Sequence, residues 1–150
     1  MSVYKKVLTT TDLSNECDHI VKQGYELAKS IQADFHVLHV IPTDIAEIQH
    51  ISDDKQYFAQ QQIAVEPNYE EQVKLALAEL ATRHQINEKN IHIGHGSIKQ
   101  VVNDYISQHD FDLVVLGSHN RYGLKLLLGS SSDKLIHSLE CDILAIRIPQ

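Results

Sequence analysis

Residues 113–131 read LVVLGSHNRYGLKLLLGSS, and this stretch decides the fold. Its first four residues form an apolar run that is typical of a buried strand, and residues 133–139, which follow it, have the pattern of a helix. Glycines and hydroxyl side chains lie between the two. Backbone N–H groups in such a loop, at the start of a helix, can face an anion. The stretch therefore predicts a strand–loop–helix unit that suits a phosphate, and so a nucleotide.

The rest of the chain repeats this alternation of strand and helix. Apolar residues at helical spacing predict helices that include residues 20–31, 73–81 and 98–106. Short apolar or β-branched runs predict five strands, at residues 7–10, 35–41, 91–93, 113–116 and 143–148. Alternation of this kind gives parallel strands, and nearly continuous apolar runs fit a sheet covered on both faces. We therefore expect an α/β fold in one domain (residues 1–150), a doubly wound five-stranded parallel sheet with helices on both faces.

Three local features complete the expected fold. Asp12 or Ser14 should be the N-cap of the first helix. Gly24 falls on the apolar stripe of that helix, where it would allow close approach to the sheet at a cost in helix propensity. Residues 43–68 show no sustained period, and we expect a partly helical excursion there, because long structureless loops are uncommon in compact domains.

Composition indicates a globular protein of the cytoplasm. The 150 residues carry a formal net charge of −7 and are 43% hydrophobic. Lys and Arg form no dense cluster, so nucleic-acid binding is not expected. The start of the chain lacks a signal-peptide core, and no apolar stretch approaches the length of a membrane span. Cys17 and Cys141 are too few for a disulfide framework and are interpreted as reduced thiols.

Two loops have the residues and the position for ligand binding. In a doubly wound sheet, ligands bind beyond the carboxyl ends of the strands, where the strand order reverses. The loops after the first and fourth strands, residues 9–14 and 117–131, are the candidates for that place. In the first loop, Asp12 could accept a hydrogen bond from a ribose hydroxyl or help to hold a metal, or it could only cap the helix.

The second loop could hold phosphate through the backbone amides at its carboxyl end and through its positively charged side chains. Backbone amides at Gly129, Ser130 and Ser131 open the last helix, where the helix dipole favours an anion. Arg121 and Lys125 could supply positive charge. The alternative is a plain strand–helix connection whose glycines serve turn geometry.

The sequence offers no catalytic or metal motif. The Walker pattern, the G-x-G-x-x-G fingerprint after the first strand and a zinc pattern among the ten histidines are all missing. His36, His39 and His92 lie in or beside predicted strands and are interpreted as structural residues. His119, inside the glycine loop, is the one histidine to watch. No nucleophile–base pair can be inferred from spacing, so we predict neither catalytic residues nor metal ligands.

At this point the chain resembles the universal stress protein family, of the small single-domain type. The resemblance covers essentially the whole length. It includes VLTTTDLS at 7–14, LHVI at 38–41, DLVVLG at 112–117 and CDILAIR at 141–147. The most specific part is Gly117-Ser118-His119 followed by LLLGS at 126–130.

The resemblance implies a sheet ordered 3-2-1-4-5. It also implies a homodimer formed through the last strand, around Ile143–Ile148, and, in the binding members, ATP as a ligand, with or without Mg. Adenine would contact the backbone near Val40, the ribose would lie near Asp12, and the phosphates would lie along the glycine loop. The implied ligand-binding residues are Thr10, Thr11, Asp12, Val40, Leu116, Gly117, His119, Asn120, Arg121, Gly129, Ser130 and Ser131.

The glycine loop departs from the binders' usual motif, G-x-x-G-x9-G-[ST], in two ways. Asn120 stands where the second glycine belongs, and eight residues separate it from Gly129. Asn tolerates a left-handed backbone better than most residues, so it is a natural replacement there. Gly123 restores flexibility to the shortened loop.

Three functional hypotheses follow. The first is a cytoplasmic stress-response dimer in which ATP is a regulatory ligand that orders the loops. The second is a dimerisation or interaction module that binds no nucleotide, supported by Asn120 and the short loop. The third is a slow ATPase or a self-phosphorylating protein with Ser130 or Ser131 as acceptor, and it ranks last because no general base is marked.

Overall fold

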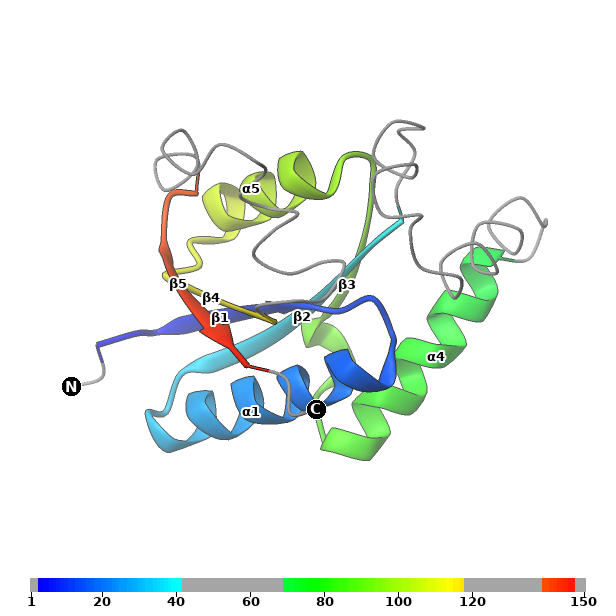
Figure 1. Cartoon of the computed structure of the whole chain (residues 1–150), viewed down its shortest axis with the longest axis horizontal. Helices are drawn as coiled ribbons and strands as arrows, with labels where there is room; N and C mark the ends of the chain where they lie inside the picture. Colours follow the sequence, from blue (N-terminus) through cyan, green and yellow to red (C-terminus); the bar gives the residue numbers. More distant parts are fainter. Residues whose placement is uncertain (1–2, 42–68, 118–138, 148–150) are drawn as a thin grey trace.

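The computed structural model describes residues 3–41, 69–117 and 139–147, which form one five-stranded sheet and the helices that pack on it (Figure 1). All four strand pairs are parallel, and the strand order is β3-β2-β1-β4-β5. The strands are β1 Lys6–Thr10, β2 Asp34–Ile41, β3 Ile91–His95, β4 Leu113–Gly117 and β5 Asp142–Ile146. The helices are α1 Asn15–Ser30, α4 Tyr69–His84 and α5 Ile98–His109, with a 3₁₀ turn η1 at Glu88–Asn90. The predicted fold class and strand order are confirmed.

Two strand ends differ from the prediction by two residues, and strand pairing accompanies both. β3 runs to His95 rather than ending at Ile93, because Gly94 and His95 pair with the last two residues of β2. β5 ends at Ile146 rather than at Ile148, because its partner β4 ends at Gly117, which pairs with Ile146. The excursion expected at residues 43–68 and nearly all of the helix expected at 133–139 lie outside the described residues.

The two faces of the sheet carry separate cores, because successive strand residues point to opposite sides. On one face, α5 packs its buried residues Ile98, Val102 and Ile106 on side chains from β1, β2 and β4. On the other face, α1 covers the alternate residues of the same strands, and Leu80 of α4 joins that core. Because both faces are covered, the strands need apolar residues at nearly every position, which explains their continuous apolar runs.

Gly24 lets α1 lie close to the sheet, as the sequence predicts. A Cβ atom on Gly24 would lie 2.9 Å from Cε1 of Phe35 and 3.2 Å from Oγ1 of Thr9. The first distance is shorter than normal packing permits, so even alanine would force a shift here. The glycine thus brings α1 close to β1 and β2, and with it the loop that joins β1 to α1.

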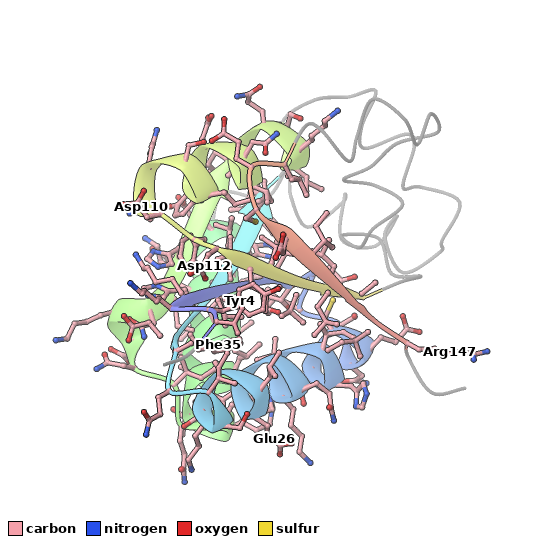
Figure 2. The ribbon with its side chains drawn as sticks, turned by 90° about the vertical axis from the view of Figure 1, so that its left-hand side faces the viewer. Tyr4, Glu26, Phe35, Asp110, Asp112 and Arg147 are labelled. Carbon is pink, nitrogen blue, oxygen red and sulfur yellow. The ribbon has the colours of Figure 1, made fainter. Side chains whose placement is uncertain are left out.

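The amino end of the sheet is held by carboxylates (Figure 2). Asp112, just before β4, accepts hydrogen bonds from the backbone N–H groups of Lys5 and Lys6 at 2.8 and 3.0 Å. The Tyr4 hydroxyl donates to Asp142 at 2.8 Å, which ties the start of the chain to β5. These contacts fix the register of β1 against its neighbours. In the described part of the chain, no helix is both long and apolar enough to cross a membrane.

Candidate functional site

The strand order reverses between β1 and β4. From β1 the chain moves outward through β2 and β3, and it then crosses to β4 and β5 on the other side of β1. Thr9 pairs with Val115, and soon after this pair β1 ends at Thr10 and β4 ends at Gly117. The loops after β1 and after β4 therefore begin side by side at the carboxyl edge, the place where such sheets bind ligands.

Hydrogen bonds fix the start of the first loop to both neighbouring strands. On the β4 side, the Thr9 hydroxyl donates to the Val115 carbonyl at 2.8 Å. On the β2 side, the Thr11 N–H donates to the Leu38 carbonyl at 3.0 Å, and Nδ1 of His39 lies 2.8 Å from the Thr11 carbonyl oxygen. A carbonyl can only accept, so His39 carries a proton on Nδ1. These bonds hold the backbone of Thr11 in one position.

Asp12 and Ser14 have different roles at the start of α1. Ser14 is the N-cap, and its hydroxyl accepts a hydrogen bond from the Cys17 N–H at 3.2 Å. Oδ1 of Asp12 accepts from the Ser14 N–H at 2.8 Å and so closes a turn around Leu13. Leu13 has a φ of 67°, in the left-handed region that leucine rarely adopts. The strain at Leu13 is therefore stabilised by side-chain hydrogen bonds on both sides of it, including one from its own N–H to the Thr11 hydroxyl at 3.0 Å.

The first residues of the loop after β1 are polar but almost completely buried. Thr10, Thr11 and Asp12 are at most 3% exposed. Burial raises the pKa of the Cys17 thiol, and the nearby Asp12 adds to the effect, so this thiol stays protonated and is not a nucleophile at neutral pH. Burial lowers the pKa of His39, against the opposing effects of the Thr11 carbonyl and Asp12, so His39 stays neutral. Within the described residues, the loop after β1 thus presents fixed dipoles and the Asp12 carboxylate rather than an acid–base pair.

The comparison with models of protein families gives a match over nearly the whole chain. The model of the universal stress protein family matches residues 3–147. The chain belongs to the universal stress protein family. The match covers the loop after β1, the strand β4 with its following glycine loop, and the last strand, so the resemblance inferred from the motifs is confirmed.

Relatives and solved structures of the family agree with this assignment. Universal stress protein A homolog 2 of Coxiella burnetii is 29% identical, over 99% of this chain and 98% of its own. The universal stress protein A homolog of Haemophilus influenzae is 30% identical, over 96% of each. Among structures, universal stress protein UspA from Lactobacillus plantarum superposes with a TM-score of 0.58 at 22% identity, over 98% of this chain and 100% of its own.

Two further structures of the family were solved as complexes. A universal stress protein in complex with cAMP superposes with a TM-score of 0.64 at 16% identity, over 97% of this chain and 98% of its own. The universal stress protein from Archaeoglobus fulgidus in complex with dAMP superposes with a TM-score of 0.58 at 12% identity, over 96% and 98%. At these identities the likeness shows the shared α/β fold.

Six residues predicted for the site of this universal stress protein lie on three adjacent strands or directly after them. Val40 is on β2, Thr10 ends β1, and Thr11 and Asp12 follow it. Leu116 and Gly117 end β4, next to β1. The structure therefore brings these six to one edge of the sheet. The other predicted residues, His119, Asn120, Arg121, Gly129, Ser130 and Ser131, lie outside the described residues.

Two residues at this edge were not predicted as part of the site. His39 fixes the Thr11 carbonyl, and Sγ of Cys17 lies 3.4 Å from the Asp12 N–H, within the range of a hydrogen bond to sulfur. The signal for His39 was a polar residue inside an apolar strand of the family motif LHVI. Cys17 gave no signal, because a cysteine in the first turn of a helix usually only packs. Within the described ranges, no group of three or more His, Cys, Asp or Glu side chains could hold a metal ion.

Proposed function

We propose that the protein is a cytoplasmic, single-domain universal stress protein that binds ATP as a regulatory ligand in a stress response. The observation that supports it most is the convergence of the Asp12 loop and Gly117 at the reversal of strand order. This is the position at which doubly wound sheets bind nucleotides. The family complexes with cAMP and dAMP support an adenine nucleotide as the ligand class.

The roles of the site residues follow from their chemistry. We propose that Asp12 accepts a hydrogen bond from a ribose hydroxyl while its Oδ1 keeps the turn at Ser14, since a carboxylate can accept several hydrogen bonds. Val40 would hold adenine through its backbone. The amides near Gly129, Ser130 and Ser131 would hold the phosphates, with or without Mg, because unpaired N–H groups at a helix start favour anions.

The chemistry of the described edge favours a nucleotide that acts as a regulatory ligand over a nucleotide that is a substrate. Besides the Asp12 carboxylate, which accepts a hydrogen bond from the Ser14 N–H, and the threonine hydroxyls, the described edge has two groups that could act as base or nucleophile, His39 and Cys17. His39 is 2% exposed and bonded to a backbone carbonyl, and Cys17 is a buried, protonated thiol. Neither can reach a nucleotide phosphate as it stands. Self-phosphorylation at Ser130 or Ser131 is the enzymatic alternative, and mass spectrometry after incubation with ATP distinguishes it.

Nucleotide binding should raise the melting temperature. ATP at about 100 times its Kd would add about 2.7 kcal/mol of stability, which raises Tm by roughly 5–10 °C for a chain of this size. The measurement is thermal unfolding with ATP, AMP, cAMP and GTP, each with and without Mg. A shift with adenine nucleotides and none with GTP supports the proposed site. Equal melting temperatures with and without all four nucleotides would favour the non-binding interaction module.

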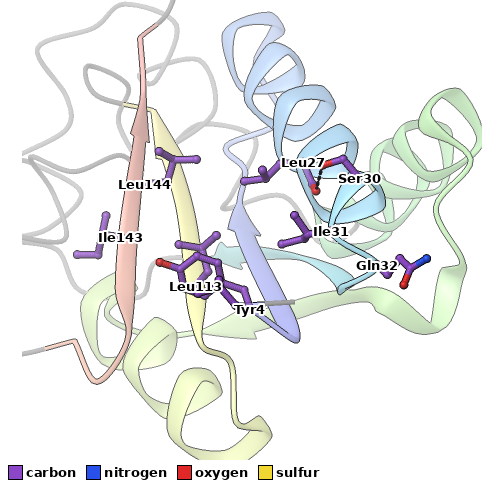
Figure 3. Close-up of a pocket in the computed structure, with 9 residues that line it drawn as sticks. Tyr4, Leu27, Ser30, Ile31, Gln32, Leu113, Ile143 and Leu144 are labelled. Carbon is purple, nitrogen blue, oxygen red and sulfur yellow. Dashed lines mark hydrogen bonds between the residues drawn. The ribbon is translucent and has the colours of Figure 1, made fainter. Parts of the chain in front are cut away.

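We also propose that the protein forms a homodimer through β5. Among the described strands, β5 pairs on one side only, with β4, and it leaves Leu144 and Ala145 exposed. Beside it, between α1 and the amino end of the sheet, lies a cavity of about 610 Å³ lined by Leu27, Ile31, Leu113 and Leu144 (Figure 3). An apolar edge strand next to an apolar hollow is a surface that soluble proteins cover.

Leu144→Arg should convert the dimer to a monomer. The new charge would lie opposite its own copy in a two-fold β5 pairing and would weaken self-association by about 100-fold or more. Sedimentation equilibrium across a concentration series measures the change. Leu75→Arg is the matched control, because Leu75 is 67% exposed on α4, far along the sheet from β5, and should not change the assembly. A wild-type monomer at all concentrations, or a dimer unaffected by Leu144→Arg, would contradict the β5 interface.

A further inference from the structure

A cluster of histidines lies on the α5 face at the amino end of the sheet, away from the Asp12 loop. It consists of His36 near the start of β2, His92 near the start of β3 and His109 at the end of α5, and we name these three the imidazole cluster. Tyr105 of α5 and Phe111, which follows α5, complete its packing. The cluster therefore joins the last turn of α5 to the β2–β3 edge of the sheet.

The rings of His36 and His92 share a hydrogen bond that requires one unprotonated nitrogen. Nδ1 of His36 lies 2.9 Å from Nε2 of His92, and the two rings are nearly parallel, 10° apart. One hydrogen bond at this distance holds one proton, so at least one of the two nitrogens must be unprotonated. His92 also stacks on His109, with centroids 6.2 Å apart and planes at 23°. A proton added to the acceptor nitrogen of the His36–His92 pair would place two N–H groups against each other and a positive charge in the stack.

The charges around the cluster oppose such a proton. From β1, the Lys6 ammonium donates to the His109 carbonyl at 2.6 Å and lies 4.8 Å from the centre of the Phe111 ring. β2 contributes Asp34, a carboxylate that acts in the opposite sense on His36. β3 contributes His92, and α5 contributes Tyr105 and His109. The neighbours are thus mostly cationic or neutral, so they disfavour a positive charge on His36 and His92.

We propose that the imidazole cluster is an acid-sensitive contact that holds the last turn of α5 on the β2–β3 edge at neutral pH and releases it when a proton is added to the acceptor nitrogen of the His36–His92 hydrogen bond. The hydrogen bond between His36 and His92 then breaks, and repulsion from Lys6 and the paired ring separates the stack. The contact lies at the opposite end of the sheet from the nucleotide edge, so it does not depend on nucleotide binding.

The direction of the pH effect follows from the histidine pKa values. Burial first, and then His92 and Lys6, lower the pKa of His36 from 6.5 to about 4, and burial together with His109 lowers that of His92. A released ring regains its ordinary pKa near 6.5, so the released form binds more protons between pH 6.5 and 4. Stability of the contact is therefore complete above pH 6.5 and falls as the pH drops towards 4.

Backbone hydrogen exchange tests the contact directly. If His36 alone titrates, the difference between its pKa values in the held and released forms limits the increase in opening of the last turn of α5 between pH 7.5 and pH 5 to about 30-fold. We expect an increase of about tenfold, because the ring is half-buried. The readout is the protection of the amides of residues 105–109, corrected for the intrinsic pH dependence of exchange. The double variant His36→Phe/His92→Phe keeps the stacked rings without their titration and should show no such loss. His95→Phe, at the exposed carboxyl end of β3, is the matched control and should behave as wild type.

The outcomes separate the proposal from general acid destabilisation. A loss of protection confined to the α5 end and removed by the double variant supports the contact. Unchanged wild-type protection, or an equal loss in the double variant, overturns it. If the double variant does not fold, NMR titration of the wild-type imidazole signals decides: a His36 midpoint near 4 supports the contact, and a midpoint near 6.5 overturns it.

Discussion

Asp12→Asn should weaken ATP binding by about tenfold or more while it leaves the free energy of unfolding almost unchanged. The asparagine oxygen can still accept the hydrogen bond from the Ser14 N–H, so the turn around Leu13 is kept. The negative charge that would accept from a ribose hydroxyl is lost. A hydrogen bond to a charged group contributes about 1.5–3 kcal/mol, and each 1.4 kcal/mol is tenfold in affinity. Calorimetric titration and urea unfolding measure the two effects separately.

Two further variants separate the ligand role of Asp12 from its turn role. Asp12→Ala removes both, so it should lose ATP affinity and also about 1–2 kcal/mol of stability. Ser14→Ala removes the N-cap hydrogen bond to Cys17, and it should cost about 1 kcal/mol with ATP affinity retained. Wild-type affinity in Asp12→Asn would show that Asp12 serves only the start of α1.

Gly94→Ala should lower the free energy of unfolding by about 2–3 kcal/mol, the range expected for overpacking a close contact. Gly94 is buried in β3, and a Cβ atom there would overlap Cγ1 of Val101 on α5. The overlap would push α5 away from the sheet. Urea unfolding monitored by circular dichroism gives the difference in free energy and its slope.

A double-mutant cycle shows whether Val101 is the cause. Val101→Ala removes the overlapping atom, so Gly94→Ala/Val101→Ala should be more stable than the sum of the single effects by about 1–2 kcal/mol. Val102→Ala is the matched control, since Val102 is the next residue of α5 and is buried there but does not meet the added Cβ. Its effect should add to that of Gly94→Ala. Additive behaviour with Val101 would contradict the close approach of α5 and β3.

The sequence predicted which strands form better than it predicted the residues at which they end. Apolar runs locate all five strands because the two-sided sheet demands them, but no local pattern shows where a strand stops pairing. β5 ends with Ile146 because β4 ends with Gly117, and β3 extends to His95 because β2 reaches Ile41. These limits depend on neighbours that lie far away in the sequence. Gly24 could be predicted, since its place on the apolar stripe of α1 already indicated a close approach.

The candidate site could be predicted in position but not in its internal contacts. The loops after the first and fourth strands indicated the edge, and the choice between Asp12 and Ser14 as N-cap stayed open. Only the structure shows that Ser14 caps while Asp12 closes the turn before it. The pairing of His36 with His92 depends on the register of β2 against β3, in which Leu38 lies opposite His92. Composition gave ten histidines but no means of seeing which of them meet.

Isothermal titration of ATP with Mg into the purified protein, after removal of any retained nucleotide, tests the central claim most directly. Any nucleotide retained from the cell is first released by denaturation and identified, and the refolded protein is then titrated. We expect binding of one nucleotide per chain with a Kd well below about 1 mM, and about tenfold weaker binding in Asp12→Asn. No heat of binding at millimolar ATP, together with no retained nucleotide, would contradict a nucleotide site at the carboxyl edge of β1 and β4.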